Sequence, residues 1–586
     1  MKDNERGWAM ATAKPLWVQS DGTLLLDERH RDRDEAGRLL RQFAELRKRP
    51  GAWHTYVMTK VTLWNAAAAG WRSQSVIDAL ATLSGHSLPH ATERMIRENM
   101  DRYGQIRLVA EGGELRLYTE TRELLEQLAS TVAPRGLIEP TVVSEGKGAR
   151  AVSKQYVRVR DEHRGTLKRE LAALGYPVKD EAGFHAGEPL AMSMRARTDA
   201  GAEVALRSYQ SEAADALLGN ESAGGGSGVV VLPCGAGKTW VGMAAMARLQ
   251  CETLILTPNG VSVSQWIAEL LRHTTLTEAE VGEYTGRTKD VKPVTVATYQ
   301  VLTYRNTRDG RYPHLRLFVN RDWGLIIYDE VHLLPAPVFR MTADIQATRR
   351  LGLTATLVRE DGKEADAFSL IGPKLYELPW KAAESGEWIA KASCTEVRVP
   401  LDREVAGQYA DAPKSDRHRI AGENPRKAEV VKALLEKHKH TPTLVIGHYL
   451  DQLRVLSQQL ALPLITGETS HRNRLMLFEK FKSGEISALL VSKVANFAVD
   501  LPDAAVAIQV SGSYGSRQEE AQRLGRILRP KKTSVEAAFY SLVSEGTDEV
   551  EFARNRGRFL LEQGYGYVVD RSVINEVSGT GGEGKG

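Results

Sequence analysis

The stretch VVVLPCGAGKTW, residues 229–240, is the strongest indication of the fold, because an apolar run ends there in a glycine-rich turn. The run predicts a buried β-strand, and a helix is expected to begin near Lys238. Successive N–H groups ahead of a helix N-terminus form a cradle for phosphate oxygens. The usual eight-residue signature has glycine where this chain has Leu232, and the following turn can accommodate that departure. The predicted cradle comprises Pro233, Cys234, Gly235, Ala236, Gly237, Lys238 and Thr239.

Two residues of this turn carry side-chain chemistry. Lys238 would place a positive charge on the β- and γ-phosphates of a nucleotide, and the Thr239 hydroxyl would ligate Mg²⁺. A second stretch, GLIIYDEVH at residues 324–332, is an apolar strand that ends in two adjacent carboxylates. Asp329 would hold the magnesium through water, and Glu330 would orient and deprotonate the attacking water. The alternative interpretation of the acidic pair is a simple strand cap.

The rest of the chain from about residue 205 repeats the same rhythm of apolar runs and helical stretches. Five runs, from GVVVLP to RRLGLTAT, fall within residues 228–356, and four more, from TLVIGHY to AVAIQVS, fall within residues 443–511. Continuous apolar runs alternating with helices are typical of parallel sheets covered on both faces. We therefore expect two α/β halves, separated by a polar stretch near residue 400.

The N-terminal part has a different pattern. Three helical stretches within residues 62–104 precede IRLVAEGGELRLYTE, residues 106–120, which reads as a hairpin around Gly-Gly. Helices followed by a hairpin predict a winged-helix-like region, and its alternative role is packing without any ligand. A strand-like KQYVRVR and a basic helix, within residues 154–176, predict a small α+β domain.

Bulk properties exclude several classes of protein. The chain of 586 residues is 42% hydrophobic and 26% charged, as in ordinary globular proteins that carry several domains. Its net charge of +4 favours a polyanionic partner only weakly. Three cysteines without C-x-x-C spacing argue against structural zinc and against disulfides. With no apolar run long enough to span a membrane, we expect a cytoplasmic protein without a membrane partner.

Hydrolysis of a nucleotide also needs cations for the charge that develops on the γ-phosphate. EEAQRLGRILRP, residues 519–530, places Gln522, Arg523, Arg526 and Arg529 on a predicted helix of the second half. Arginines delivered from a second domain would make hydrolysis depend on closure of the two halves, with an effect of roughly 10³–10⁵ on the rate. Dependence of this kind is typical of a motor that moves along a track.

Across about residues 205–550 the chain resembles superfamily 2 helicases. PCGAGKT, DEVH, TAT and QRLGR match motifs I, II, III and VI, and LRSYQ matches the element that reads adenine, which implicates Arg207 and Gln210. LGLTATLVRED, IGPKLYE and the N-terminal PLWVQSDGTLLLDERH resemble the bacterial XPB branch. The resemblance implies an α/β fold with tandem RecA-like domains, ATP and Mg²⁺ as cofactors, and 3′→5′ unwinding of DNA.

The residue patterns and the resemblance together predict a set of domains. We expect a winged-helix-like region at 1–130, an α+β domain at 131–200 in the place of a damage-recognition domain, RecA-like domains at 201–400 and 401–570, and a disordered tail at 571–586. The resemblance implies that Thr354 and Thr356 couple the ATP site to DNA, and that Arg359, Glu360 and Asp361 form the RED motif used in strand separation. The implied nucleic-acid contacts are Pro258, Gln265, Trp266, Thr298, Tyr299, Gly467, Ser492 and Lys493.

Other functions remain open on the sequence. The chain could be a translocase that remodels protein–DNA complexes without processive unwinding, an RNA helicase, or the motor of a restriction enzyme, although no nuclease-like cluster is found. A scaffold with an inactive ATP site is disfavoured because Lys238, Asp329, Glu330, Arg526 and Arg529 are all present. The expected role is in DNA repair, and the resemblance implies a nuclease or another repair protein as partner.

Overall fold

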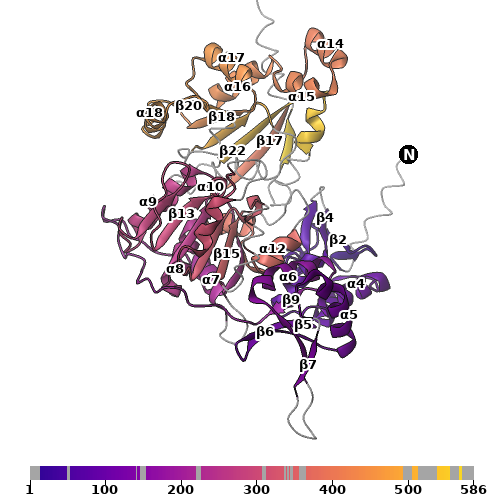
Figure 1. Ribbon diagram of the computed structural model, residues 1–586. Coiled ribbons are helices and arrows are strands. Elements are labelled where there is room, and N and C mark those ends of the chain that lie inside the picture. The colour runs from indigo at the N-terminus through magenta and orange to yellow at the C-terminus, as the bar shows by residue number, and fades with distance from the viewer. Residues whose placement is uncertain are drawn as a thin grey trace, which may run out of the picture. The chain divides into compact units, whose positions relative to one another are not determined.

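The computed structural model forms two compact units, the first mainly from residues up to 377 and the second mainly from residues 378 onward (Figure 1). The structure describes residues 14–48, 53–139, 141–145, 154–219, 226–305, 312–335, 338, 342, 348–355, 364–492, 504–512, 537–554 and 567–570.

The first unit begins with a four-stranded antiparallel sheet covered by helices. Its strand order is β1 (Leu16–Val18), β2 (Thr23–Asp27), β4 (Trp53–Val57) and β3 (Glu45–Lys48). The helices are α1 (Arg33–Leu40), α2 (Lys60–Ala68), α3 (Ser73–Leu83) and α4 (His90–Met100). Alternating apolar residues of the strands, such as Leu24 and Leu26, share one core with Leu63, Leu80 and Ile96 of the helices. The three helices predicted between residues 62 and 104 are confirmed.

The predicted hairpin is present, but it belongs to a different sheet from the one on which these helices pack. Strands β5 (Ile106–Glu111) and β6 (Glu114–Thr119) join β7 (Val142–Glu145), β8 (Lys154–Val159) and β9 (Val178–Asp180) in the order β7-β8-β6-β5-β9. Helices α5 (Arg122–Val132) and α6 (Arg164–Ala173) cover this sheet. Leu108, Leu117, Val157 and Leu167 form its core, so the hairpin is not the wing that we expected after the preceding helices.

A seven-stranded parallel sheet follows, in the order β12-β13-β11-β14-β15-β10-β16. Its strands, in chain order, are β10 (Ser227–Val231), β11 (Thr253–Thr257), β12 (Val281–Tyr284), β13 (Val294–Thr298), β14 (Leu325–Asp329), β15 (Arg349–Thr354) and β16 (Lys374–Glu377). Associated helices are α7 (Ser208–Leu218), α8 (Lys238–Leu249), α9 (Gly260–His273), α10 (Tyr299–Leu302) and α12 (Glu364–Leu370) (Figure 1). All residues of β11 and β13 are buried, which explains their unbroken apolar and threonine sequences.

Helix α12 joins this sheet to both N-terminal modules. Phe368 of α12 packs with Trp64 of α2 and Ala172 of α6. The Asn65 side-chain carbonyl accepts a hydrogen bond from the Lys374 N–H at 2.7 Å. The three parts therefore share a buried junction directly after residues 356–363.

Buried charges reinforce the same junction. Asp180 accepts hydrogen bonds from Arg164 at 2.7 and 3.0 Å and from Lys168 at 2.9 Å. The guanidinium of Arg350, on β15, lies 5.5 Å from the ring centroid of Phe184, and that of Arg164 lies 5.7 Å from it. Burial would by itself raise the pKa of Asp180, but Lys168 and Arg164 outweigh burial and hold that pKa well below its usual range. The carboxylate thus stays ionised where these segments meet.

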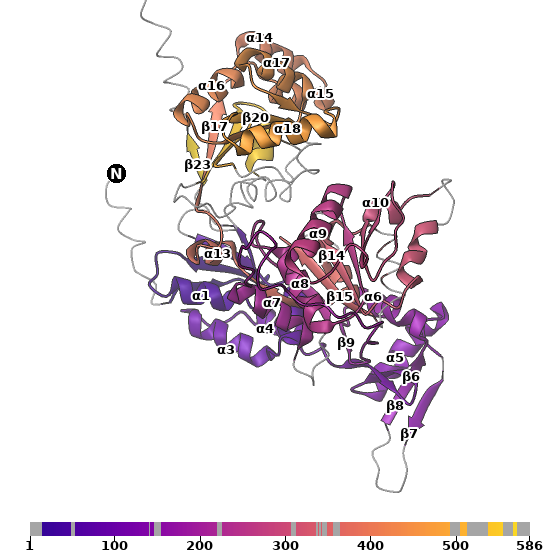
Figure 2. The same cartoon turned by 90° about the vertical axis from the view of Figure 1, so that its left-hand side faces the viewer.

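The second unit contains the other seven-stranded parallel sheet, in the order β19-β20-β18-β21-β22-β17-β23. Its strands are β17 (Ala392–Val399), β18 (Thr443–Gly447), β19 (Leu464–Ile465), β20 (Ala488–Ser492), β21 (Val506–Gln509), β22 (Ala537–Ser544) and β23 (Tyr567–Asp570). Its helices include α14 (Arg403–Asp411), α15 (Lys414–Gly422), α16 (Lys427–Lys437), α17 (Leu450–Leu460) and α18 (His471–Lys482), which surround the strands (Figure 2).

One detail of the second unit, the start of its sheet, differs from the sequence expectation. Strand β17 pairs along its whole length with β22, so the second sheet begins at Ala392 and not after residue 400. The polar stretch that separates the two apolar sets forms helices α14 and α15, and α14 has no buried residue. Expectations for the tail at 571–586 lie outside the described residues.

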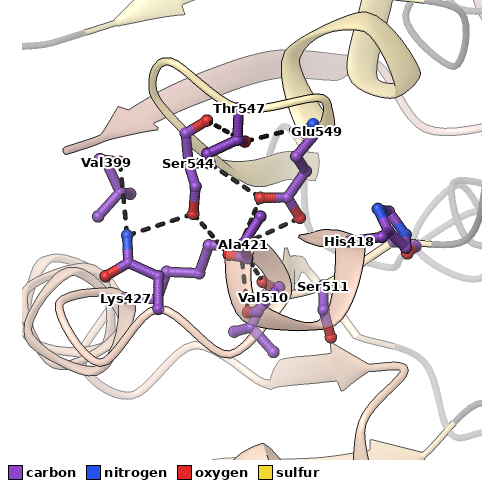
Figure 3. A network of polar contacts seen from close by, with 12 residues as sticks. Val399, His418, Ala421, Lys427, Val510, Ser511, Ser544, Thr547 and Glu549 are labelled. Atoms are coloured by element: carbon purple, nitrogen blue, oxygen red, sulfur yellow. Dashed lines mark hydrogen bonds and ion pairs between the residues drawn. The ribbon is translucent and has the colours of Figure 1, made fainter. Parts of the chain in front are cut away.

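A buried ion pair links the connections around the second sheet (Figure 3). Lys427 Nζ lies 2.8 Å from one Glu549 carboxylate oxygen and 3.1 Å from the other, and it donates a further hydrogen bond to the Val510 carbonyl at 2.9 Å. Glu549 also accepts from the Ser544 N–H at 2.9 Å. Together these bonds tie the start of α16 to the residues after β21 and β22.

Within the part of the chain that the structure describes, no helix combines the length and the apolar composition needed to cross a membrane.

Candidate active site

Strand register brings the ends of three strands to one edge of the first sheet. Strand β15 lies between β10 and β14, and all three run parallel. Val231 pairs with Thr354, and Asp329 pairs with Leu353. The glycine-rich turn, the acidic pair and the threonine motif therefore start from neighbouring carboxyl ends, which is where ligands bind in open α/β sheets.

The turn after β10 has the backbone of an anion cradle. Gly235 and Gly237 have φ angles of +83° and +81°, a region that side-chain-bearing residues rarely adopt. The Ala236 N–H donates to the Pro233 carbonyl at 3.1 Å, which closes the turn. Helix α8 then begins at Lys238 and continues through Thr239, so both residues lie in its first turn. Glycines at these two positions leave the N–H groups free of steric cover by a Cβ atom.

Glu330 has an unusual backbone conformation directly after β14. Its φ of +50° and ψ of +54° lie in the left-handed region, although it is not glycine. A non-glycine residue in this region costs on the order of 1–3 kcal/mol and persists where the surroundings impose it, often at active sites. His332 Nδ1 lies 3.5 Å from Glu330 and 2.8 Å from the Thr354 hydroxyl. His332 thereby connects the acidic pair with Thr354, a link that the sequence analysis did not assign.

Two aromatic residues hold Asp329. The indole N–H of Trp266 donates to Asp329 Oδ2 at 3.0 Å, and the Tyr299 hydroxyl donates to the Asp329 carbonyl at 2.8 Å. Burial, together with the charges of Asp329 and Glu330, raises the pKa of Tyr299 well above its ordinary value. Tyr299 is therefore a neutral hydrogen-bond donor under ordinary conditions.

Residues predicted to read adenine lie at the start of α7. The Gln210 side-chain carbonyl accepts from the Arg207 N–H at 2.9 Å, and Arg207 Nη1 donates to the Tyr209 hydroxyl at 3.3 Å. Gln210 is buried, and its carbonyl caps the first turn of the helix. These bonds fix the geometry of the element that we expect to face the base.

The predicted DNA contacts of the first sheet fall into two groups. Gln265 is exposed on α9, and Pro258 is half-buried after β11. Trp266, Thr298 and Tyr299 are buried, with exposed fractions of 2–4%. The Thr298 hydroxyl accepts from the Val301 N–H at 3.2 Å and caps α10. These three side chains thus have interior partners in place of the surface position that we expected.

In the second sheet, Gly467 is exposed after β19, whereas Ser492 is buried at the end of β20. The remaining predicted residues lie outside the described part of the chain. They are Thr356, Arg359, Glu360, Asp361, Lys493, Gln522, Arg523, Arg526 and Arg529. Gly512 directly precedes the stretch with the predicted arginines, and its carbonyl lies 3.1 Å from His418 Nε2.

The described residues fit the cofactors implied by the resemblance. The hydroxyl of Thr239 and the carboxylate of Asp329 are hard oxygen donors, which Mg²⁺ prefers. A turn with Gly235 and Gly237 at positive φ suits the phosphates of ATP. The role of Trp266 beside Asp329 was missed because sequence alone does not show which way a helical tryptophan points.

Comparison with known families gives matches to three family models, two of which are described as helicases. A family model described as ERCC3/RAD25/XPB C-terminal helicase matches residues 383–580. Models described as the res subunit of type III restriction enzymes and as a helicase conserved C-terminal domain match residues 203–359 and 16–138. The second parallel sheet lies within residues 383–580, and every strand of the first parallel sheet except β16 lies within residues 203–359.

Curated relatives extend the likeness to nearly the full length. The chain is 50% identical to a DNA 3′-5′ helicase XPB of Kineococcus radiotolerans, over 96% of this chain and 98% of that protein. It is also 50% identical to a DNA 3′-5′ helicase XPB of Mycobacterium tuberculosis, over 95% of this chain and 98% of that protein. The chain is 32% identical to a protein of Encephalitozoon cuniculi named general transcription and DNA repair factor IIH helicase/translocase subunit XPB, over 95% of this chain and 82% of that protein. Identity at this level over this length shows that the chain belongs to the XPB family of helicases.

Proposed function

We propose that this chain is an ATP-dependent 3′–5′ DNA helicase that opens duplex DNA in DNA repair. One observation carries the proposal: Val231, Thr354 and Asp329 lie at the same carboxyl edge of neighbouring parallel strands. A glycine-rich turn that precedes a helix follows the first strand, and a carboxylate pair ends the third. This is the arrangement with which P-loop ATPases bind and hydrolyse a nucleotide.

The polar residues of the glycine-rich turn and of the carboxylate pair each have a role in hydrolysis. Lys238 neutralises charge on the β- and γ-phosphates, while Thr239 and Asp329 hold Mg²⁺. The metal, when bound, neutralises charge that develops on the transferred phosphoryl group. Glu330 accepts a proton from the attacking water and orients it. Glu330 lies directly after β14, in the left-handed backbone conformation.

Further assignments rest on the resemblance. Arg207 and Gln210 bind adenine, and Gln522, Arg526 and Arg529 act on the γ-phosphate from the second α/β half. The hydrogen bond between His332 and Thr354 supports a route by which the nucleotide state reaches the residues that follow β15. These residues include Thr356, which we propose to take part in the coupling. They also include the triplet at 359–361, which we propose to act in strand separation.

We propose that DNA is bound by residues of α9 and of the segments that follow β11, β19 and β20. Gln265 and Gly467 are exposed, as contacts with a sugar–phosphate backbone require. Lys493 adds a positive charge in the sequence after β20, and Pro258 directly follows β11. Contacts of this kind suit a motor that moves on DNA without regard to sequence.

Steady-state ATPase measurement with and without DNA tests the nucleotide site. Lys238→Ala and Glu330→Gln should each abolish DNA-stimulated turnover while the circular dichroism spectrum and melting temperature remain those of the parent. Normal turnover in either variant would refute the assignment of the site. An exposed replacement such as Gln265→Ala should instead leave turnover without DNA unchanged and weaken the stimulation by DNA.

Unwinding assays test the polarity and the strand-separation role. Forked and 3′-tailed duplexes should be unwound with ATP, whereas 5′-tailed duplexes should not. Replacing Arg359, Glu360 and Asp361 with alanine should reduce unwinding more than ATPase activity. Stimulation of ATPase by DNA with no unwinding of any duplex would favour a translocase that remodels protein–DNA complexes.

A further inference from the structure

Trp266 lies at a point where three elements of the nucleotide site meet. Its side chain is buried with 2% exposure, and its indole N–H donates to Asp329 Oδ2 at 3.0 Å. Indole nitrogen is a donor only, so this bond has one direction and cannot be exchanged for an accepting one. A carboxylate held by a fixed donor loses rotational freedom about its terminal torsion, which is otherwise broad.

The ring of Trp266 also touches the helix that follows the glycine-rich turn. A Cβ atom on Gly242 of α8 would lie 2.6 Å from Trp266 Cη2 and 3.4 Å from Ile327 Cδ1. The indole therefore packs directly against the α8 backbone beside a side chain of β14. Only glycine at this position leaves room for the ring, so the position of the ring is defined from two sides.

Two neighbouring residues of α9 differ in their exposure to solvent. Gln265 is exposed, whereas Trp266 is buried against Asp329 and Gly242. The exposed side of the helix start is the segment that we propose to contact DNA. Trp266 directly follows Gln265, and its indole reaches the Asp329 carboxylate, which we propose to hold magnesium.

We propose that Trp266 is a positioning residue, which sets the orientation of the Asp329 carboxylate for metal binding and makes that orientation depend on the position of α9. The inference rests on the proposed function of Asp329. Hydrogen bonds from outer residues to metal-ligating carboxylates fix ligand orientation, and their loss typically weakens metal affinity or activity by about 10- to 100-fold. The alternative is that Trp266 only packs in the core, and that its hydrogen bond to Asp329 has no effect on metal binding.

The chain offers a matched control. Trp323 is also buried in the first unit, with 1% exposure, and its indole N–H donates to the Leu317 carbonyl at 2.8 Å. Trp323→Phe and Trp266→Phe each remove one buried indole donor and keep an aromatic ring. Only the second substitution removes a bond to a proposed metal ligand.

The test is an equilibrium titration of Mn²⁺ into the full chain with ADP, followed by electron paramagnetic resonance of the free ion. Trp266→Phe should bind Mn²⁺ about tenfold more weakly than the parent, whereas Trp323→Phe should bind like the parent. In ATPase assays Trp266→Phe should need about tenfold more Mg²⁺ for half-maximal rate, with a smaller change in the rate at saturating Mg²⁺. Equal Mn²⁺ affinity in the two phenylalanine variants would overturn the inference.

Two further variants separate the possible failures. Gly242→Ala crowds the ring from the α8 side and should weaken Mn²⁺ binding in the same direction with the donor still present; parent-like affinity in this variant would also count against the inference. Asp329→Asn tests the metal ligand itself. If Asp329→Asn binds Mn²⁺ like the parent, the proposed metal site is wrong, whereas weak binding by Asp329→Asn beside normal binding by Trp266→Phe refutes only the role of Trp266.

Discussion

Replacement of Lys427 by methionine should strongly destabilise the second unit. The side chains of Lys427 and Glu549 are 1% and 0% exposed, and the ammonium group makes contacts of 2.8 and 3.1 Å to the carboxylate. Methionine keeps most of the volume of lysine but removes the charge and its hydrogen bonds. Glu549 would remain buried with the Ser544 N–H as a donor and without its cation.

The magnitude follows from the cost of a buried charge that loses its partner. Removing one member of a buried ion pair typically costs about 3–5 kcal/mol, whereas replacing both members with neutral groups is often close to neutral. A loss of this size corresponds to roughly 150- to 4,000-fold faster hydrogen exchange for amides that exchange through opening of the unit. The double variant Lys427→Met/Glu549→Gln should therefore be better protected than Lys427→Met alone.

Hydrogen–deuterium exchange with mass spectrometry on the intact chain measures this effect, in peptides that cover β22. Arg419→Met is the control because Arg419 forms an ion pair with Glu423 on the surface of the same unit, at 3.1 Å. Exposed pairs contribute little, so this variant should leave the protection of β22 unchanged. Strictly additive effects of Lys427→Met and Glu549→Gln in the double variant would refute the reasoning.

Three further predictions concern the first unit. Because the folded-state pKa of Asp180 lies below its ordinary value of 3.8, its contribution to stability is complete above about pH 4 and is lost as the pH falls further. At pH 7 the melting temperature of Asp180→Asn should be lower than that of the parent. Below pH 4 the melting temperature of the variant should depend less on pH, and equal slopes of melting temperature against pH in the two proteins would contradict this. Phe368→Ala should cost about 3–5 kcal/mol and speed exchange in α2 and α6 as well as α12, whereas a change limited to α12 would mean that the junction does not connect the modules. Thr354→Val removes the hydroxyl beside His332 and should lower the ratio of DNA-stimulated to basal ATPase; an unchanged ratio would exclude the coupling role.

The two parallel sheets and the strands that carry the candidate site could be predicted from the amino-acid sequence. Continuous apolar runs such as residues 229–231 and 325–328 are local signals, and burial on both faces allows few other interpretations. The glycine-rich turn could also be predicted directly, because glycine is the residue that most readily adopts the positive φ angles found at Gly235 and Gly237. Strand polarity then implied that the turn and the acidic pair share one edge of the sheet.

The assignment of strands to sheets and the burial of particular polar residues could not be predicted in this way and are known from the three-dimensional structure. The hairpin of β5 and β6 pairs with β8 and β9, and β17 pairs with β22, in each case through residues distant along the chain. Lys427 and Trp266 have the sequence character of ordinary helix positions, yet one is buried against Glu549 and the other against Asp329. The physical reason is that the cost of burying a charge or a donor depends on a partner far away in the sequence, which no local pattern records.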